Sequence, residues 1–181
     1  MTFMDDSVSG PKCGHNFLSM SPEDTRTFAE RLSHYSFPGL VVLISGTLGA
    51  GKTEFVRGFA SRFTRDVVRS PSFTLINEYK GFIPIAHVDL YRIENDASME
   101  LSLEEYTLEG FIVLLEWPEN WDGEKPSETW TVVLAMQEGL PPGAEGYNVR
   151  FVKVTCEGPT ACRRLGQFFS RFCAERGEAE R

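Results

Sequence analysis

The chain has 181 residues, enough for one domain with a buried core, and 41% hydrophobic and 24% charged residues are ordinary proportions for a globular protein. A formal net charge of −8 argues against a broad basic surface for nucleic acid, although it permits a local basic patch. No apolar run approaches a membrane span, and the first residues lack the basic and apolar regions of a secretory signal, so we expect a cytoplasmic protein with no membrane contact.

Hydrophobic periodicity and turn-forming residues divide the chain into strands and helices. The start of the first helix is well marked, because Ser21 can cap it and Pro22 suits its first position. In chain order we expect an edge strand at 17–20, a helix from 21 that ends at 38–39, a buried strand at 40–44, a loop at 46–51, a helix at 52–63, a strand hairpin at 74–79 and 83–90, a helical tendency at 99–103, a buried strand at 111–115, a strand pair at 129–136 and 147–155, and a final helix from 159.

The order of these elements predicts the fold class. The aliphatic runs at 40–44 and 111–115 suit strands that are buried on both faces, as in a parallel sheet covered by helices. We therefore expect an α/β fold, a three-layer sandwich of the P-loop NTPase type with a mostly parallel central sheet and antiparallel hairpin additions. A single ATPase domain at 17–175 is expected to follow a flexible arm at 1–16 and to precede a charged tail at 176–181.

The four cysteines do not suggest a metal site or a disulfide framework. No Cys-x-x-Cys pair occurs among Cys13, Cys156, Cys162 and Cys173. The segment Cys13-Gly14-His15 lacks the further ligands that a zinc site needs. We expect reduced thiols in a cytoplasmic protein.

The segment GTLGAGKT at 46–53 fits the pattern Gly-x-x-x-x-Gly-Lys-[Ser/Thr] of a phosphate-binding loop. It stands between an expected buried strand and an expected amphipathic helix, which is the context that this loop requires. Glycines let backbone N–H groups approach phosphate oxygens, and the helix N-terminus attracts the same anion. Lys52 is expected to reach the β- and γ-phosphates of a nucleotide, and the Thr53 hydroxyl to bind Mg²⁺.

Such a loop also needs an acid at the end of a neighbouring strand, to hold the metal or its water. Glu116 ends the apolar run FIVLLE, and Asp89 ends the strand IPIAHVDL. We expect both to complete the metal–water shell, and the residues leave open which of them orients the attacking water. His87 shares a strand face with Asp89, where it either orients that acid or is structural.

The nucleotide is expected to be ATP. Guanine recognition usually uses an Asn-Lys-x-Asp run, and GTPase switches usually carry Asp-x-x-Gly; the chain has neither. Lys52, Asp89 and Glu116 are the expected catalytic residues, and Thr53, Glu116 and Asp89 are the expected metal ligands. The residues expected to bind the nucleotide are Gly46, Leu48, Gly49, Ala50, Gly51, Lys52, Thr53, Glu54 and Trp117. For Trp117 the alternatives are stacking near the nucleotide, a contact surface, or packing beside Pro118.

Four segments together resemble the bacterial tRNA threonylcarbamoyladenosine biosynthesis ATPase family, TsaE. They are GTLGAGKT at 46–53, SPSFTL at 70–75, HVDLYR at 87–92 and LLEWPEN at 114–120, in the order and spacing of that family. The resemblance extends over about 17–130, and the HxDLYR and EW segments do not recur in P-loop proteins generally.

The resemblance implies an ATPase that supports transfer of a threonylcarbamoyl group to adenosine 37 of tRNAs that read ANN codons. TsaD-like and TsaB-like partner subunits perform the transfer, so tRNA is reached only indirectly, which agrees with the acidic net charge. The chain has no obvious internal arginine finger, and we expect slow ATP turnover by the chain alone and stimulation by partners.

Two positions depart from the family pattern. Thr47 occupies a loop position that is often acidic in the family, so its role stays open. Ser72 replaces a threonine of the family's SPT segment, and Thr74 offers a second hydroxyl nearby. Either Ser72 or Thr74 is a candidate switch residue that senses the γ-phosphate and its Mg²⁺.

Two other functions use the same loop. A small-molecule or nucleoside kinase would usually add an arginine-bearing lid, whereas the region after Glu116 has no arginine until Arg150. A non-enzymatic ATP-dependent switch would bind partners with little turnover.

Overall fold

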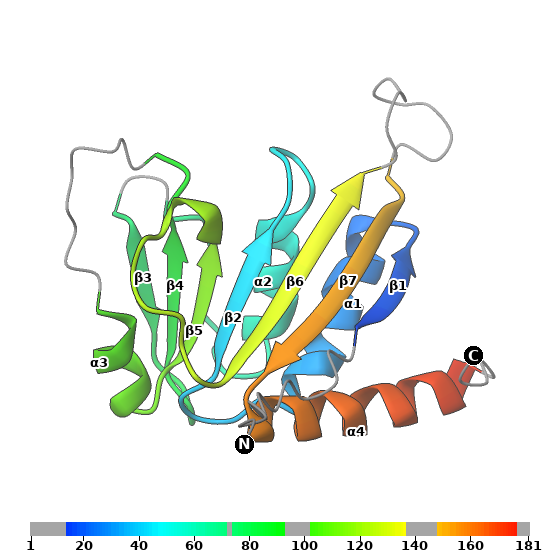
Figure 1. Cartoon of the computed structure of the whole chain (residues 1–181). Coiled ribbons are helices and arrows are strands. Elements are labelled where there is room, and N and C mark those ends of the chain that lie inside the picture. The colour runs from blue at the N-terminus through cyan, green and yellow to red at the C-terminus, as the bar shows by residue number, and fades with distance from the viewer. Residues whose placement is uncertain (1–13, 72–73, 93–101, 137–147, 177–181) are drawn as a thin grey trace, which may run out of the picture.

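The computed structural model describes residues 14–71, 74–92, 102–136 and 148–176. Seven strands form one sheet, with three helices on one face and a short helix on the other (Figure 1). The elements are β1 (His15–Ser19), α1 (Pro22–Ser33), β2 (Val41–Ser45), α2 (Lys52–Ala60), β3 (Ile76–Tyr79), β4 (Ile85–Asp89), α3 (Leu103–Leu108), β5 (Ile112–Glu116), the 3-10 turn η1 (Pro118–Asn120), β6 (Thr129–Met136), β7 (Arg150–Glu157) and α4 (Pro159–Arg176).

The sheet has a parallel centre and antiparallel edges. Its strand order is β1-β7-β6-β2-β5-β4-β3. The pairs β6–β2, β2–β5 and β5–β4 are parallel, whereas β3 and the pair β7–β1 are joined antiparallel at the two sides. The expected α/β fold with a mostly parallel core and antiparallel additions is therefore confirmed. Because the central strands are parallel, their carboxyl ends lie at one edge of the sheet, where ligand sites of open α/β sheets form.

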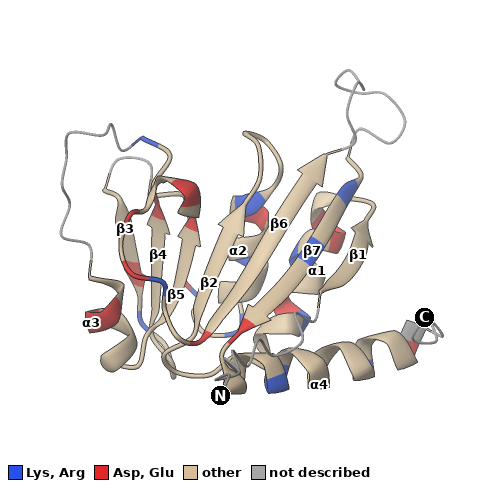
Figure 2. Cartoon of the chain, viewed as in Figure 1, with Lys and Arg blue, Asp and Glu red and all other residues tan. Residues whose placement is uncertain are grey.

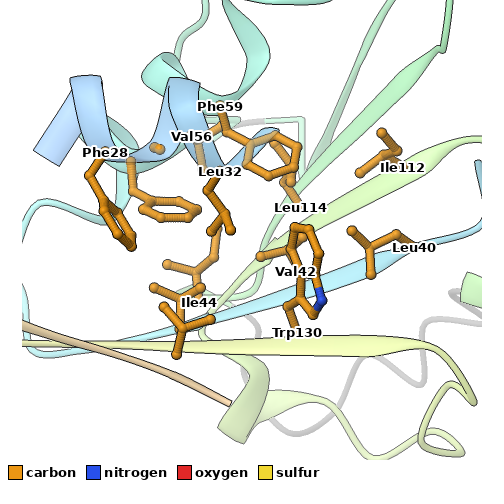
Figure 3. Close-up of a cluster of buried hydrophobic side chains, with 14 of the residues drawn as sticks. Phe28, Leu32, Leu40, Val42, Ile44, Val56, Phe59, Ile112, Leu114 and Trp130 are labelled. Atoms are coloured by element: carbon orange, nitrogen blue, oxygen red, sulfur yellow. The ribbon is translucent and has the colours of Figure 1, made fainter. Parts of the chain in front are cut away.

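The main core lies between the sheet and helices α1, α2 and α4. Figure 3 shows aromatic and aliphatic side chains of both helices and strands meeting there, with Trp130 of β6 beside Val42 of β2. Trp130 is fully buried and its indole N–H donates to the carbonyl oxygen of Ala161 at 2.9 Å. This bond satisfies the one polar atom of the largest core side chain, and it ties the start of α4 to the sheet.

The opposite face of the sheet is covered only in part. A smaller core joins α3 to the outward side chains of β2, β4 and β5. On the same face, β1, β7 and β6 present the exposed side chains Leu18, Phe151 and Val133. Among the described residues, the third layer therefore consists of one six-residue helix and connecting segments beside it. Within the described ranges, no helix combines the length and apolar character needed to cross a membrane.

Predicted element boundaries differ from the observed ones mainly at helix ends. Helix α1 begins as expected, with the Ser21 hydroxyl accepting from the amide of Asp24 at 3.1 Å, but it ends at Ser33 instead of at 38–39. The hydroxyl of Ser33 donates to the carbonyl oxygen of Glu30 at 2.6 Å, a local bond that competes with helical geometry. Helix α2 likewise ends at Ala60. Strand β1 begins at His15, inside the segment predicted as an arm, and the division into arm, domain and tail stays a prediction.

The expectation of reduced thiols is wrong for one pair of cysteines. Cys156, near the end of β7, forms a disulfide with Cys162 in the first turn of α4. Gly158, with a φ of 92°, reverses the chain between them and brings their Cα atoms to 5.2 Å, within the range that a disulfide spans. Cys173 is a free thiol. The six-residue spacing carries no sequence signature, because the pairing depends on a strand-to-helix turn.

Helices α1 and α2 approach so closely that a glycine is required at their crossing. A Cβ at residue 58 would lie 2.2 Å from the backbone oxygen of Arg26. Helix propensity alone favours Gly58→Ala by about 1 kcal/mol. We expect instead a loss of about 1–3 kcal/mol in the free energy of unfolding, because overpacking forces the helices apart.

Chemical denaturation measures this effect, and Gly166→Ala in α4 is the matched control. A Cβ at residue 166 would meet no atom within 4 Å, so only the propensity gain of about 1 kcal/mol is expected there. Equal stabilisation by both substitutions would contradict the packing argument.

Candidate functional site

The loop between β2 and α2 has a backbone that only glycines adopt readily. Gly46 has a φ of 150°, and a Cβ there would lie 2.5 Å from the carbonyl oxygen of Leu134 in β6. Gly51 precedes α2 with a left-handed φ of 98°. The loop therefore packs against β6 on one side and leads directly into the N-terminus of α2. The unpaired N–H groups of that helix end attract anions.

Lys52 is buried at the start of α2. Its Nζ donates to the carbonyl oxygens of Gly46 at 2.6 Å and Thr47 at 3.0 Å, and lies 3.7 Å from the ring centroid of Trp117. Burial lowers the pKa of Lys52, and the charges of Glu116, Glu119 and Asp89 act in the opposite direction. The ammonium is thus held inside the loop, under an aromatic ring that stabilises a cation.

Glu116 lies beside the first turn of α2 and is almost fully buried. The hydroxyl of Thr53 donates to its carboxylate, 3.2 Å from Oε1 and 3.4 Å from Oε2. His87 Nε2 lies 2.9 Å from the same Oε1, and His87 is 0% exposed. Its Nδ1 has no hydrogen-bond partner among the described residues. His87 therefore contacts Glu116, and not Asp89 as one alternative expected.

Asp89 lies next to Glu116 because β4 and β5 are parallel neighbours in a register that pairs these two residues. Its Oδ2 accepts from the hydroxyl of Ser70 at 2.6 Å, and its Oδ1 accepts from the amide of Tyr91 at 3.1 Å. Figure 2 shows these acidic strand ends beside the loop between β2 and α2. Asp89 is partly exposed, so its carboxylate can face a ligand as well as its protein partners.

These side chains line a cavity of about 350 Å³ at the carboxyl edge of the sheet. Its lining residues are Leu48, Gly49, Gly51, Lys52, Thr53, Glu54, Ser70, Asp89, Tyr91, Arg92, Glu116 and Trp117. Most of the predicted nucleotide-binding residues are thus brought together. Gly46 and buried Ala50 shape the loop without lining this cavity, and Thr47 is exposed.

The two candidate switch residues are placed differently. Thr74 does not line the cavity, and its hydroxyl donates to the side-chain oxygen of Asn77 at 2.9 Å. Ser72 lies outside the described residues. Ser70, which was not selected from the sequence, lines the cavity and contacts Asp89 directly. Its only sequence signal was its place at the start of SPSFTL.

The donor set suits Mg²⁺ held together with phosphate. In the part of the chain that the structure describes, no three His, Cys, Asp or Glu side chains cluster as a metal site by themselves. Mg²⁺ keeps several waters and is usually bound through one or two carboxylates plus substrate phosphates. The Thr53 hydroxyl and the neighbouring carboxylates of Glu116 and Asp89 meet that requirement beside the glycine-rich loop.

Trp117 has an unusual backbone, with a left-handed φ of 61° at the start of η1. This conformation is rare for a bulky residue and points to a constraint at the site. Its ring lies 4.8 Å from the ring of Tyr91 as well as over the Lys52 ammonium. Trp117 lines the cavity, and the choice between stacking near a nucleotide, a contact surface and packing beside Pro118 stays a prediction.

Comparison with known proteins agrees with this geometry. The family model of "Threonylcarbamoyl adenosine biosynthesis protein TsaE" matches residues 19–140. The TsaE protein of Bacillus subtilis is 40% identical over 119 residues, which are 64% of this chain and 74% of that protein. TsaE of a Nostoc species is 45% identical over 103 residues, covering 53% of this chain and 62% of the relative.

A solved structure extends the similarity beyond the matched segment. The crystal structure of YdiB from Bacillus subtilis superposes with a TM-score of 0.74 at 27% identity, covering 90% of this chain and 99% of that one. The family model spans the glycine-rich loop at 46–51, both strand-end acids and Trp117. The chain belongs to the TsaE family of threonylcarbamoyl adenosine biosynthesis proteins and has a part in that tRNA modification.

Proposed function

We propose that this chain is a Mg²⁺-dependent ATPase that supports threonylcarbamoyl transfer to adenosine 37 of ANN-decoding tRNAs, together with TsaB-like and TsaD-like subunits. The observation that carries the proposal is the convergence of Lys52, Thr53, Glu116 and Asp89 on one cavity at a glycine-rich loop. A loop, a lysine, a hydroxyl and strand-end acids are the parts that ATP hydrolysis needs. Membership of the TsaE family indicates the pathway in which this ATPase would act, threonylcarbamoyl adenosine biosynthesis.

The roles of the side chains follow from their positions. Loop amides and the N-terminus of α2 would bind the phosphates, and Lys52 would neutralise charge on the β- and γ-phosphoryl oxygens. Mg²⁺, when bound, would supply further charge neutralisation. Thr53 and Glu116 are adjacent through their hydrogen bond and would hold it. Asp89, held by Ser70 and the Tyr91 amide, would complete the metal–water shell.

The substrate and the partners can be tested in one assay of phosphate release. We expect slow turnover of ATP by the isolated protein and at least about tenfold faster turnover with a TsaB–TsaD complex, because cationic groups supplied in trans often accelerate phosphoryl transfer. Rapid turnover that is indifferent to TsaB–TsaD would contradict the proposed division of labour. Conversion of ATP to ADP that requires an added small-molecule acceptor, and that releases no inorganic phosphate, would indicate a kinase instead.

The biological role needs a second readout. Reconstituted modification of an ANN-decoding tRNA, followed over several turnovers, should depend on this protein and on ATP hydrolysis. Full modification in its absence, or equal support by a variant that binds ATP without hydrolysing it, would replace the ATPase role by that of a switch or of a bystander.

A further inference from the structure

Arg150, the first residue of β7, reaches the phosphate-binding loop from behind. Its Nε donates to the carbonyl oxygen of Ala50 at 3.0 Å, and its Nη2 to that of Gly49 at 3.4 Å. A third bond joins Nη1 to the carbonyl oxygen of Val149 at 3.1 Å. Arg150 is only 8% exposed, and it does not line the cavity described above. Its guanidinium therefore acts on the loop and not on a ligand in that cavity.

A loop that offers N–H groups to phosphate must turn its carbonyl groups elsewhere. A buried carbonyl without a donor destabilises the fold, so the rear of the loop needs donors as much as its front needs an anion. In this structure Lys52 donates to the carbonyl oxygens of Gly46 and Thr47. Arg150 donates to those of Gly49 and Ala50. A guanidinium suits this task, because its fixed fork contacts two acceptors at once.

The hairpin of β6 and β7 also backs the loop sterically. β6 pairs in parallel with β2, and its Leu134 carbonyl oxygen occupies the place of a side chain at residue 46. Arg150 pairs with Met136, which lies two residues beyond Leu134 at the same end of the β6–β7 ladder. The loop is thus fixed at its start by β6 and at its centre by β7.

We propose that Arg150 is a positioning residue, which holds the loop in the conformation that binds the β-phosphate. The inference rests on the proposed nucleotide binding. It adds a residue that lies beyond the 19–140 segment matched by the family model. When a nucleotide binds, the loop amides need not change their orientation, because Arg150 already holds the Gly49 and Ala50 carbonyls of the same peptide backbone.

The affinity increment that the β-phosphate contributes is the quantity to measure. ADP and AMP are titrated calorimetrically into the unaltered protein, Arg150→Met and Arg150→Lys. We expect Arg150→Met to weaken the binding of ADP at least tenfold, about 1.4 kcal/mol, while the affinity for AMP changes little. The ADP affinity of Arg150→Lys should lie between those of the unaltered protein and Arg150→Met, because an ammonium lacks the planar fork of a guanidinium. A merely structural role would reduce the binding stoichiometry through unfolded protein and leave the dissociation constant of the folded fraction unchanged.

Arg163→Met is the control, because Arg163 is an exposed arginine of α4. If Arg150→Met does not fold, Arg150→Lys is followed by hydrogen–deuterium exchange, in which residues 46–53 should exchange faster while β5 is unchanged. ADP affinity and loop exchange that match the unaltered protein in the folded variants would overturn the inference. Absence of ADP binding in the unaltered protein would instead overturn the proposed function, and the exchange experiment would still decide whether Arg150 holds the loop.

Discussion

Lys52→Ala is expected to abolish ATP turnover and to weaken ATP binding by about 10- to 100-fold. Lys52 is buried, and its ammonium lies inside the loop. No other side chain of the cavity lining occupies that position and could replace its charge. Charge-assisted hydrogen bonds contribute about 1.5–3 kcal/mol each, which gives the loss in affinity. Loss of an electrostatic contact to the transition state lowers the turnover rate by a factor of about 10²–10³ or more.

The measurement combines phosphate release with ATP titration. Lys80→Ala is the matched control, since Lys80 is an exposed lysine in the turn between β3 and β4. Lys52 also holds the Gly46 and Thr47 carbonyls, so the folded fraction of the variant is checked by thermal unfolding without nucleotide. Turnover at the normal rate in folded Lys52→Ala would rule out the phosphate-binding role of the loop.

Glu116→Gln is expected to lower turnover by about 10²–10⁴ while most of the affinity for ATP is kept. The amide keeps the shape of a 2% exposed side chain and can still contact Thr53 and His87, so the fold should tolerate it. What is lost is the negative charge beside the Thr53 hydroxyl, which the metal and the water would need. Binding is less affected, because the loop and Lys52 contact the phosphates directly.

Asp89→Asn in the same assay decides between the two carboxylates. If Glu116→Gln hydrolyses ATP normally and Asp89→Asn does not, the assignment of Glu116 is wrong and Asp89 takes its role. Loss of turnover in both variants supports a shared metal–water shell. Loss of ATP affinity as large as that in Lys52→Ala would instead make Glu116 a structural support of α2.

Local patterns predicted the elements of the site well. The aliphatic run before Gly46, the glycines and the apolar face of the following helix are short-range features, and they marked the loop correctly. Ser21 was recognised as a cap because its bond to Asp24 spans three residues. Predictions were poorer at helix ends, where side-chain hydroxyls such as that of Ser33 bond to the local backbone and the sequence pattern gives no sharp stop.

Pairings between distant segments could not be read in the same way. The disulfide of Cys156 and Cys162 depends on a reversal at Gly158, and the bond between Ser70 and Asp89 depends on the segment before β3 lying at the carboxyl end of β4. Arg150 follows Gly49 by 101 residues and has no motif around it, so nothing in its sequence neighbourhood indicated this contact.

By itself, the sequence determined a glycine-rich loop between a strand and a helix, two candidate acids at strand ends, an α/β fold and a resemblance to one family. These depend on residue type and spacing along the chain, which the order of residues specifies directly. Only the tertiary structure decided that β4 and β5 are neighbours with Asp89 opposite Glu116, that His87 contacts Glu116, and that Arg150 supports the loop. Those contacts depend on strand order and register, which are set by packing a whole sheet against its helices.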